Sequence, residues 1–205
     1  GYGLTEASGG FIFSPLSVAE DPDGIGYPLP DNDVITMDIN TKKEAKLGAD
    51  GEILVRGVAV MKGYLNKPKE TAEAFITVGG KKYLRTGDIG YIDEHGLVHF
   101  RSRLKRMIIS NGYNIYPANI EDVTLKCKNV EACAVVGRED KLRGEKVVVF
   151  VVPKAEVHER TIKKELNNIY RQYLAKYEIP REIRFIDALP KTKLAKVDFK
   201  ALENY

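Results

Sequence analysis

Hydrophobic and polar residues alternate in short stretches through the first hundred residues of the chain. Asp33–Ile39 shows the period of two that is typical of a half-buried strand, and Glu52–Arg56, after the turn at Asp50-Gly51, is a second expected strand. Two further apolar stretches, Ile89–Ile92 and Leu97–Phe100, flank the sequence Asp-Glu-His-Gly, which predicts a hairpin loop with its glycine at positive φ. The pattern therefore predicts a small, mostly antiparallel β unit.

A helix and a turn are expected within this unit. Pro68 suits the first turn of a helix, and Lys69–Phe75 continues as a short helical stretch. Tyr83-Leu84 then leads into Arg85-Thr86-Gly87-Asp88, for which we predict a tight turn after a strand.

The pattern changes in the second half of the chain. Lys146–Val152 is the strongest strand candidate, and Thr161–Lys176 carries apolar residues at helical spacing. The other expected elements are a helix from Pro117 with Ile120, Val123, Leu125 and Cys127 on one side, strands Ala132–Val136 and Glu182–Ile186, a polar loop Pro190–Lys196 and a helix Phe199–Asn204. The order β-α-β-β-α-β-α predicts a compact α+β domain. We therefore expect an α+β chain divided into residues 1–104 and 105–205.

Charge supports this division. The chain has 205 residues and a net charge of +3, but residues 1–104 hold 12 Lys and Arg against 15 Asp and Glu, whereas residues 105–205 hold 20 against 14. An acidic and a basic half fit two domains that share an anionic ligand, although solubility alone also accounts for them. No basic arm, zinc spacing or Arg-rich helix indicates nucleic acid as a partner.

Composition also bears on the compartment. No apolar run reaches 18 residues and no signal peptide is visible, so we predict a cytoplasmic protein without a transmembrane segment. Cys127 and Cys133 are expected to be unpaired thiols. The three histidines, His95, His99 and His158, have no metal-ligand spacing and are assigned structural or surface roles.

Two residues stand out for their chemistry. The carboxylate of Asp88, in its predicted turn, can accept both hydroxyls of a ribose, although an aspartate that caps a turn is the simpler explanation. Lys196, in the polar loop, can stabilise negative charge that develops on a phosphate, although it is also one exposed lysine among Lys191, Lys193 and Lys200. The neighbouring motifs decide between these alternatives.

Four motifs occur in a fixed order: Tyr2-Gly3-Leu4-Thr5-Glu6, Arg85-Thr86-Gly87-Asp88, Arg103-Leu104-Lys105 with Gly112-Tyr113-Asn114-Ile115-Tyr116-Pro117, and Pro190-Lys191-Thr192 with Lys196. Over essentially the whole chain their spacing resembles the adenylate-forming superfamily, which includes acyl-CoA synthetases, aryl-acid ligases, luciferases and peptide-synthetase adenylation domains. Members of this superfamily make an acyl-adenylate from a carboxylate and ATP and then pass the acyl group to a thiol. The resemblance implies ATP or AMP, Mg²⁺ and coenzyme A as ligands.

The resemblance also implies roles in nucleotide binding. Asp88 and Arg103 correspond to the residues that bind the ribose. Tyr2 would lie against the adenine, and the Thr5 hydroxyl would donate to the α-phosphate. Glu6 would ligate Mg²⁺, a hard cation that prefers oxygen ligands.

Further roles follow in the second half. Lys196 corresponds to the catalytic lysine, at the tip of a loop that we expect to be mobile. Lys105 corresponds to the hinge about which the small domain alternates between two states, and Gly112 to the side that faces the pantetheine arm of coenzyme A. Ala195 and Ser102 depart from the pattern, because glycine is common at both positions.

Two parts of the superfamily pattern are missing: the Gly/Ser/Thr-rich phosphate loop and the acyl pocket. Together with the start at Gly1, this predicts a fragment that does not catalyse adenylation by itself. The leading interpretation is the C-terminal portion of a fatty or medium-chain acyl-CoA synthetase. Two alternatives stay open: an adenylation enzyme that loads a carrier protein, and a non-catalytic nucleotide-binding relative. The acyl substrate and the oligomeric state are not defined by these residues.

Overall fold

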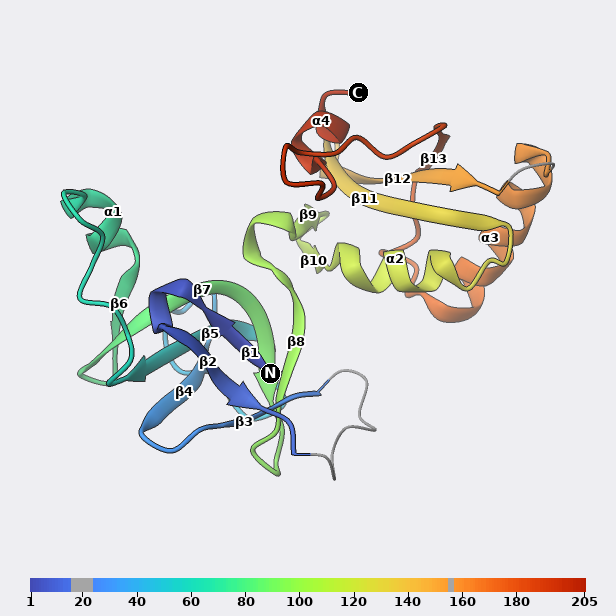
Figure 1. Ribbon diagram of the computed structural model, residues 1–205. Coiled ribbons are helices and arrows are strands. Elements are labelled where there is room, and N and C mark those ends of the chain that lie inside the picture. Colours follow the sequence, from blue (N-terminus) through green and yellow to red (C-terminus); the bar gives the residue numbers. More distant parts are fainter. Residues whose placement is uncertain (16–23, 155–156) are drawn as a thin grey trace. The chain divides into compact units, whose positions relative to one another are not determined.

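The computed structural model describes residues 1–15, 24–154 and 157–205. The chain forms two compact units, Gly1–Lys105 and Arg106–Tyr205 (Figure 1). The division that we expected between residues 104 and 105 lies one residue before the observed one.

The first unit is an antiparallel sheet. Its strands are β1 (Tyr2–Leu4), β2 (Gly9–Phe13), β3 (Gly24–Pro28), β4 (Asn32–Met37), β5 (Gly51–Gly57), β6 (Phe75–Val78), β7 (Lys81–Ile92) and β8 (Val98–Arg103). They pair in the order β1-β2-β3-β8-β7-β5-β4, and β6 also pairs with β7. The predicted strands around Val34 and Leu54 are confirmed as β4 and β5. The predicted helix is confirmed as α1 (Pro68–Glu73), which ends early because Phe75 already begins β6.

The tight turn predicted at Arg85-Thr86-Gly87-Asp88 is wrong, because β7 continues through it. Arg85 pairs with Leu54 and Ile89 pairs with Glu52, so Thr86, Gly87 and Asp88 together stand opposite Ile53. This is a β-bulge, and Gly87 with φ of +71° supplies the backbone conformation that it needs. A glycine flanked by polar residues suits a turn and a bulge equally well, and only the pairing partner distinguishes them.

The predicted hairpin between β7 and β8 is confirmed. Gly96 has φ of +79°, and Asp93 closes the loop by accepting hydrogen bonds of 2.9 Å from the backbone N–H groups of His95 and Leu97. This hairpin sets the register in which Asp88 lies opposite Arg103.

The second unit is a five-stranded sheet covered by helices. Its elements are β9 (Ile108–Ser110), β10 (Tyr113–Ile115), α2 (Pro117–Leu125), β11 (Val130–Asp140), β12 (Gly144–Pro153), α3 (Glu159–Tyr173), β13 (Glu182–Phe185) and α4 (Phe199–Glu203). The strand order is β10-β9-β12-β11, with β13 parallel to β12 and the other pairs antiparallel. The predicted α+β fold is confirmed, and α2 begins at Pro117 as expected.

The long apolar run of β12 is explained by burial on both faces. Val147, Val149 and Val151 belong to the core formed with α2 and α3, whereas Val148, Phe150 and Val152 pack with Leu202 of α4. Figure 1 shows helices on both sides of β11 and β12. A strand covered twice needs no polar face, so this run is continuous instead of alternating.

Three details differ from expectation. Leu125 is half exposed, so it does not belong to the apolar side of α2. Helix α3 ends at Tyr173, and Leu174 is already extended with φ of −109°. The hairpin β9–β10 was missed, although Asn111-Gly112 is a strong signal for a two-residue turn in which both residues have positive φ, here +51° and +79°.

Two other expectations concern sulfur and the membrane. Cys127 and Cys133 are unpaired, as predicted. Within the described ranges, no helix combines the length and the apolar composition needed to cross a membrane.

Candidate functional site

Three predicted site residues meet at Asp88. This carboxylate is fully buried on the bulge of β7. The Tyr2 hydroxyl on β1 donates a hydrogen bond of 2.5 Å to Asp88 Oδ2, and Arg103 Nε at the end of β8 lies 2.9 Å from Oδ1. The first unit therefore brings an aromatic ring, a carboxylate and a guanidinium group together from three strands.

In this cluster one carboxylate oxygen of Asp88 accepts no hydrogen bond from the residues that the structure describes. Burial raises the pKa of Asp88, whereas the Tyr2 hydrogen bond and the charge of Arg103 lower it. Burial also raises the pKa of Tyr2, so its hydroxyl remains a donor. Arg103 and Asp88 Oδ1 form an ion pair without hydrogen-bond alignment, and Oδ1 has no hydrogen-bond donor among the described residues. A buried acceptor in this state is suited to a donor from a ligand.

Two residues that we did not single out from the sequence hold the bulge in place. Glu52 on β5 is 1% exposed, binds Arg85 Nη2 at 2.8 Å and accepts the Gly87 N–H at 3.3 Å. The Thr86 hydroxyl donates to the Ile53 carbonyl oxygen at 2.7 Å and accepts the Asp88 N–H at 3.0 Å. A glutamate in a strand carries no local signal of such a role, which depends on the pairing of β5 with β7.

The segment after β1 carries the other two predicted nucleotide-site residues. Thr5 and Glu6 lie in the short 3₁₀ helix Thr5–Ala7, where Thr5 is exposed. Glu6 Oε1 accepts a hydrogen bond of 2.9 Å from the Tyr64 hydroxyl. Where the structure describes the chain, no three His, Cys, Asp or Glu residues come together as a metal site.

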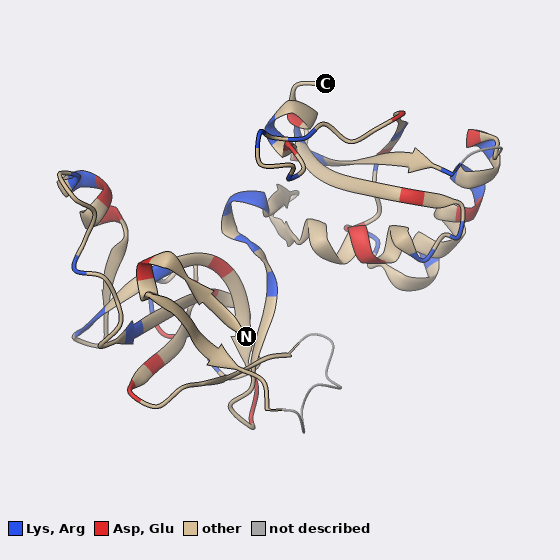
Figure 2. Ribbon diagram, viewed as in Figure 1, with Lys and Arg blue, Asp and Glu red and all other residues tan. Residues whose placement is uncertain are grey.

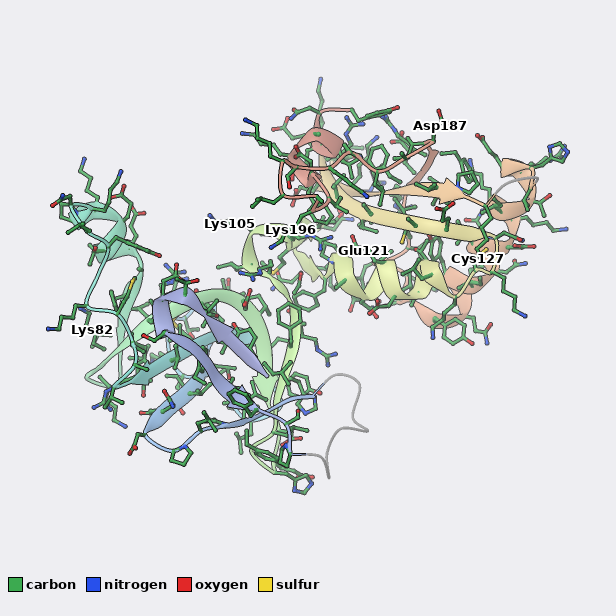
Figure 3. All side chains as sticks on the ribbon, in the orientation of Figure 1. Lys82, Lys105, Glu121, Cys127, Asp187 and Lys196 are labelled. Carbon is green, nitrogen blue, oxygen red and sulfur yellow. The ribbon has the colours of Figure 1, made fainter. Side chains whose placement is uncertain are left out.

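Lys196 lies on a closed loop of the second unit, between β13 and α4. Lys191 pairs with Val197, and the Thr192 N–H donates to the Lys196 carbonyl oxygen at 2.7 Å. Ala195 has φ of +60°, a left-handed conformation that glycine adopts without strain. The Lys196 side chain is exposed. Figure 3 labels it on this loop.

The remaining predicted site residues also have defined places. Lys105 is exposed and is the last residue of the first unit. It belongs to a basic stretch that Figure 2 shows after β8. Gly112 lies at the tip of the β9–β10 hairpin, where an added Cβ would meet no atom within 4 Å. The space beside this backbone is open.

The histidines have structural surroundings. His99 is buried, stacks on Tyr91 with ring centroids 4.3 Å apart, and lies 3.0 Å from Asp93 Oδ2. His95 is exposed in the hairpin loop, and His158 precedes α3.

Comparison with known proteins places these features in a family. The family model described as "AMP-binding enzyme" matches residues 1–65, and the model described as "AMP-binding enzyme C-terminal domain" matches residues 119–196. The chain belongs to the AMP-binding enzymes. As predicted, it is a member of the adenylate-forming superfamily.

The relatives of this AMP-binding chain are ligases. It is 40% identical to a long-chain-fatty-acid–CoA ligase of Bacillus subtilis over 197 residues, which cover 96% of this chain and 34% of that ligase. It is 36% identical to a mitochondrial medium-chain acyl-CoA ligase of Mus musculus, covering 98% of this chain and 32% of the relative. The chain thus spans about a third of the length of the curated relatives it matches.

Solved structures share the fold. The o-succinylbenzoate CoA synthetase of Bacillus subtilis, determined in complex with the acyl-adenylate intermediate OSB-AMP, matches with a TM-score of 0.84 and 32% identity over 99% of this chain and 39% of that one. The same enzyme has been solved with ATP and a magnesium ion, with a TM-score of 0.82 at the same identity and 40% coverage of that chain.

Proposed function

We propose that this chain is the C-terminal portion of an ATP-dependent acyl-CoA synthetase. The whole enzyme would convert a carboxylic acid and ATP to an acyl-adenylate and pyrophosphate, and then transfer the acyl group to coenzyme A. The observation that carries this proposal is the buried Asp88 carboxylate, paired with Arg103 and with Oδ1 free of hydrogen-bond donors. Relatives named for long-chain and medium-chain ligation favour a fatty acid as substrate.

Asp88 and Arg103 would bind the ribose of ATP. Oδ1 can accept one ribose hydroxyl, whereas Oδ2 already accepts the Tyr2 hydroxyl. Binding of both ribose hydroxyls therefore requires Tyr2 to release Oδ2, which frees its ring to lie against the adenine. The exposed Arg103 guanidinium would complete the contact, because more than half of its side chain is accessible.

Thr5 and Glu6 would face the phosphates and Mg²⁺. The exposed Thr5 hydroxyl can donate to the α-phosphate. Glu6 fits a hard cation because it is a carboxylate on the partly exposed 3₁₀ helix that follows Tyr2, but it supplies only one side chain. Most of the other ligands would come from phosphate oxygens and water, as is usual for magnesium at nucleotides. The ion would neutralise charge on the phosphates when bound.

The two units would have different roles in the enzyme. Residues 1–104 would be the C-terminal part of the large AMP-binding domain, and residues 105–205 the small mobile domain with Lys105 as the hinge. In one state Lys196 would stabilise the negative charge that develops as the carboxylate oxygen attacks the α-phosphorus. In the other state the open backbone at Gly112 would let the pantetheine arm approach.

Half-reactions of the longer enzyme that contains this sequence test the proposal. Lys196→Ala should lower carboxylate-dependent ATP–pyrophosphate exchange by roughly 10²–10³-fold, the loss expected when a group that stabilises developing charge is removed. The same variant should still convert supplied acyl-adenylate to the thioester. Lys193→Ala, in the same loop and also exposed, is the matched control. Equal loss of both half-reactions in Lys196→Ala contradicts the assigned role.

Two further outcomes separate the alternatives. The 205-residue chain alone should show no exchange activity, since the phosphate loop is missing from it. Coenzyme A should accept the acyl group in the longer enzyme. Transfer only to a phosphopantetheinyl carrier protein would instead identify a carrier-loading enzyme. Absence of adenylation with every carboxylic acid tested would favour a non-catalytic nucleotide-binding relative.

A further inference from the structure

The side chain of Arg106, the first residue of the second unit, contacts three elements of that unit. Its guanidinium lies over the Phe199 ring of α4, 3.7 Å from the ring centroid. Its Nη2 atom donates to Glu121 Oε1 on α2 at 2.5 Å and to the Val135 carbonyl oxygen on β11 at 3.5 Å. We call Arg106, Glu121, Val135 and Phe199 the Arg106 cluster.

The Arg106 cluster has little freedom to rearrange. Only 24% of the Arg106 side chain and 17% of the Glu121 side chain are exposed. Glu121 Oε1 is also fixed by the Val135 N–H at 2.8 Å, so the carboxylate cannot follow the arginine to a new position without losing a backbone partner. A flat guanidinium that stacks on a ring and binds a carboxylate at its edge is held in one plane.

The cluster reaches the Lys196 loop through Phe199, three residues beyond the lysine. The segment between them is closed by the Lys191–Val197 pairing and by the Asp198 N–H, which donates to the Pro190 carbonyl oxygen at 2.8 Å. Downstream of Lys196, Val197 and Phe199 both pack against the core formed by β11, β12 and α4, and Arg106 covers the ring of Phe199. Lys196 and Glu121 are labelled in Figure 3, on the loop before α4 and on α2.

The Arg106 cluster also includes a residue of the helix that follows the Gly112 hairpin. Glu121 stands on the first turns of α2, which begins at Pro117 directly after β10 of the Gly112 hairpin. The first residue after Lys105 is thus tied by one side chain both to the Lys196 loop and to the helix behind Gly112. Lys105 itself is exposed.

We propose that Arg106 is a positioning residue that fixes the Lys196 loop to the start of the second unit. A rotation of the backbone at Lys105 then carries Lys196 as part of a rigid body, instead of moving the loop independently. The consequence for catalysis rests on the proposed role of Lys196 in adenylation. The fixing of the loop by Arg106 does not depend on that role. An arginine that only stabilised the whole unit would protect the amides of all its elements equally from hydrogen exchange.

Hydrogen exchange on the 205-residue chain tests directly whether Arg106 fixes the Lys196 loop. In Arg106→Ala, exchange of the Thr192 and Ala195 amides should accelerate about tenfold, because local opening of the loop no longer costs the Arg106 contacts. Amides of β12 should keep their wild-type rates. Arg106→Lys, which retains a charge but not a flat stacking group, should give an intermediate acceleration. Arg171→Ala, at an exposed arginine of α3, is the matched control and should change neither set.

A second variant covers the case in which Arg106→Ala unfolds the unit. Phe199→Leu keeps an apolar anchor but removes the ring face, and it should accelerate the same two loop amides. Unchanged loop amides in both variants, or equal acceleration in the loop and in β12, overturns the proposal.

The longer enzyme distinguishes failure of this proposal from failure of the proposed function. With an intact role for Lys196, Arg106→Ala should slow adenylation more than it slows thioester formation from supplied acyl-adenylate. If Lys196→Ala itself leaves adenylation unchanged, the proposed function is wrong. The hydrogen-exchange result alone then decides whether Arg106 fixes the Lys196 loop. If Lys196→Ala is impaired and Arg106→Ala slows both half-reactions equally, the positioning role is wrong.

Discussion

The Tyr2 hydroxyl donates a hydrogen bond of 2.5 Å to the carboxylate of Asp88, 86 residues further along the chain. The two residues lie on β1 and β7, which are not neighbours in the sheet. Tyr2 also packs edge-on against Phe11, with ring centroids 5.3 Å apart. A carboxylate that is fully buried depends on such a donor, because it has lost its hydration.

Tyr2→Phe should therefore lower the free energy of unfolding of the first unit. The expected loss is about 1.5–3 kcal/mol, the usual contribution of a hydrogen bond to a charged group. Urea unfolding followed by far-UV circular dichroism measures this loss. Tyr91→Phe retains the stacking on His99 and is the control. Equal stability of Tyr2→Phe and wild type would show that the hydroxyl does not stabilise Asp88.

Glu52→Gln should destabilise the same unit more than removal of an ordinary surface charge. Glu52 is 1% exposed, and its loss of charge leaves the Arg85 guanidinium without its carboxylate partner. We expect a loss of about 3 kcal/mol, the lower end for a broken buried pair, because a third of the Arg85 side chain remains in water. Thermal unfolding of Glu70→Gln, at an exposed pair with Lys67, should show a change of about 0.5 kcal/mol. Similar losses in both variants contradict the role of Glu52.

Ala195→Gly should relax the Lys196 loop. The left-handed φ of +60° costs alanine about 1–2 kcal/mol, whereas glycine adopts it freely. Greater freedom of glycine in the unfolded chain offsets about 0.4–1 kcal/mol of this gain. The expected result is a small net stabilisation and slower exchange of the residue 195 amide, which donates to the Thr192 carbonyl oxygen at 2.9 Å. Ala195→Val should act in the opposite direction, and faster exchange in the glycine variant would refute the argument.

The pH dependence of the second unit should contain a contribution from Glu182. The hydrogen bond from Lys146, and to a smaller extent that from Arg184, lowers the pKa of Glu182 below its ordinary value of 4.5. Because the folded pKa is depressed, the stabilisation is complete above the ordinary pKa and is lost as the pH falls through the folded pKa. Its size should be about 1 kcal/mol, because both cations remain partly exposed.

Urea unfolding at a series of pH values between 6 and 3, as a rough working range for glutamate titration, measures this contribution. Glu182→Gln should flatten the profile in that window. Asp187→Asn, at an exposed carboxylate two residues beyond β13, is the control. A profile that stays steep in Glu182→Gln would assign the dependence to other groups.

The sequence predicted most of the elements for a definite physical reason. Helix α3 has apolar positions at the period that the helical backbone sets, whereas β12 is a short continuous run of β-branched and aromatic residues. Both formed close to their predicted ranges. Pro117 began α2 because its ring suits the first helical turn. The bulge at Gly87 could not be predicted in this way, because it is defined by the partner residue Ile53 and not by the local chain.

For the candidate site, too, the sequence predicted some features and left others to the fold. The types and spacing of Tyr2, Asp88, Arg103 and Lys196 are properties of the sequence, and they sufficed to predict the superfamily that the comparisons confirmed. Their proposed roles in binding and catalysis stay predictions. Glu52 and Arg106 carried no comparable local signal, since a single charged residue in a strand or a short helix is ordinarily solvated.

By itself, then, the sequence determined the α+β class, the order of the elements and the family, because each depends on local periodicity or on motifs that are read along the chain. Only the tertiary structure decided that Asp88 is buried on a bulge with one oxygen that accepts no hydrogen bond from the described part of the chain, that Glu52 holds this bulge and that Arg106 contacts both Phe199 and Glu121. These are contacts between strands and helices far apart in sequence. Their energy depends on burial and on partner geometry, which exist only once the chain has folded.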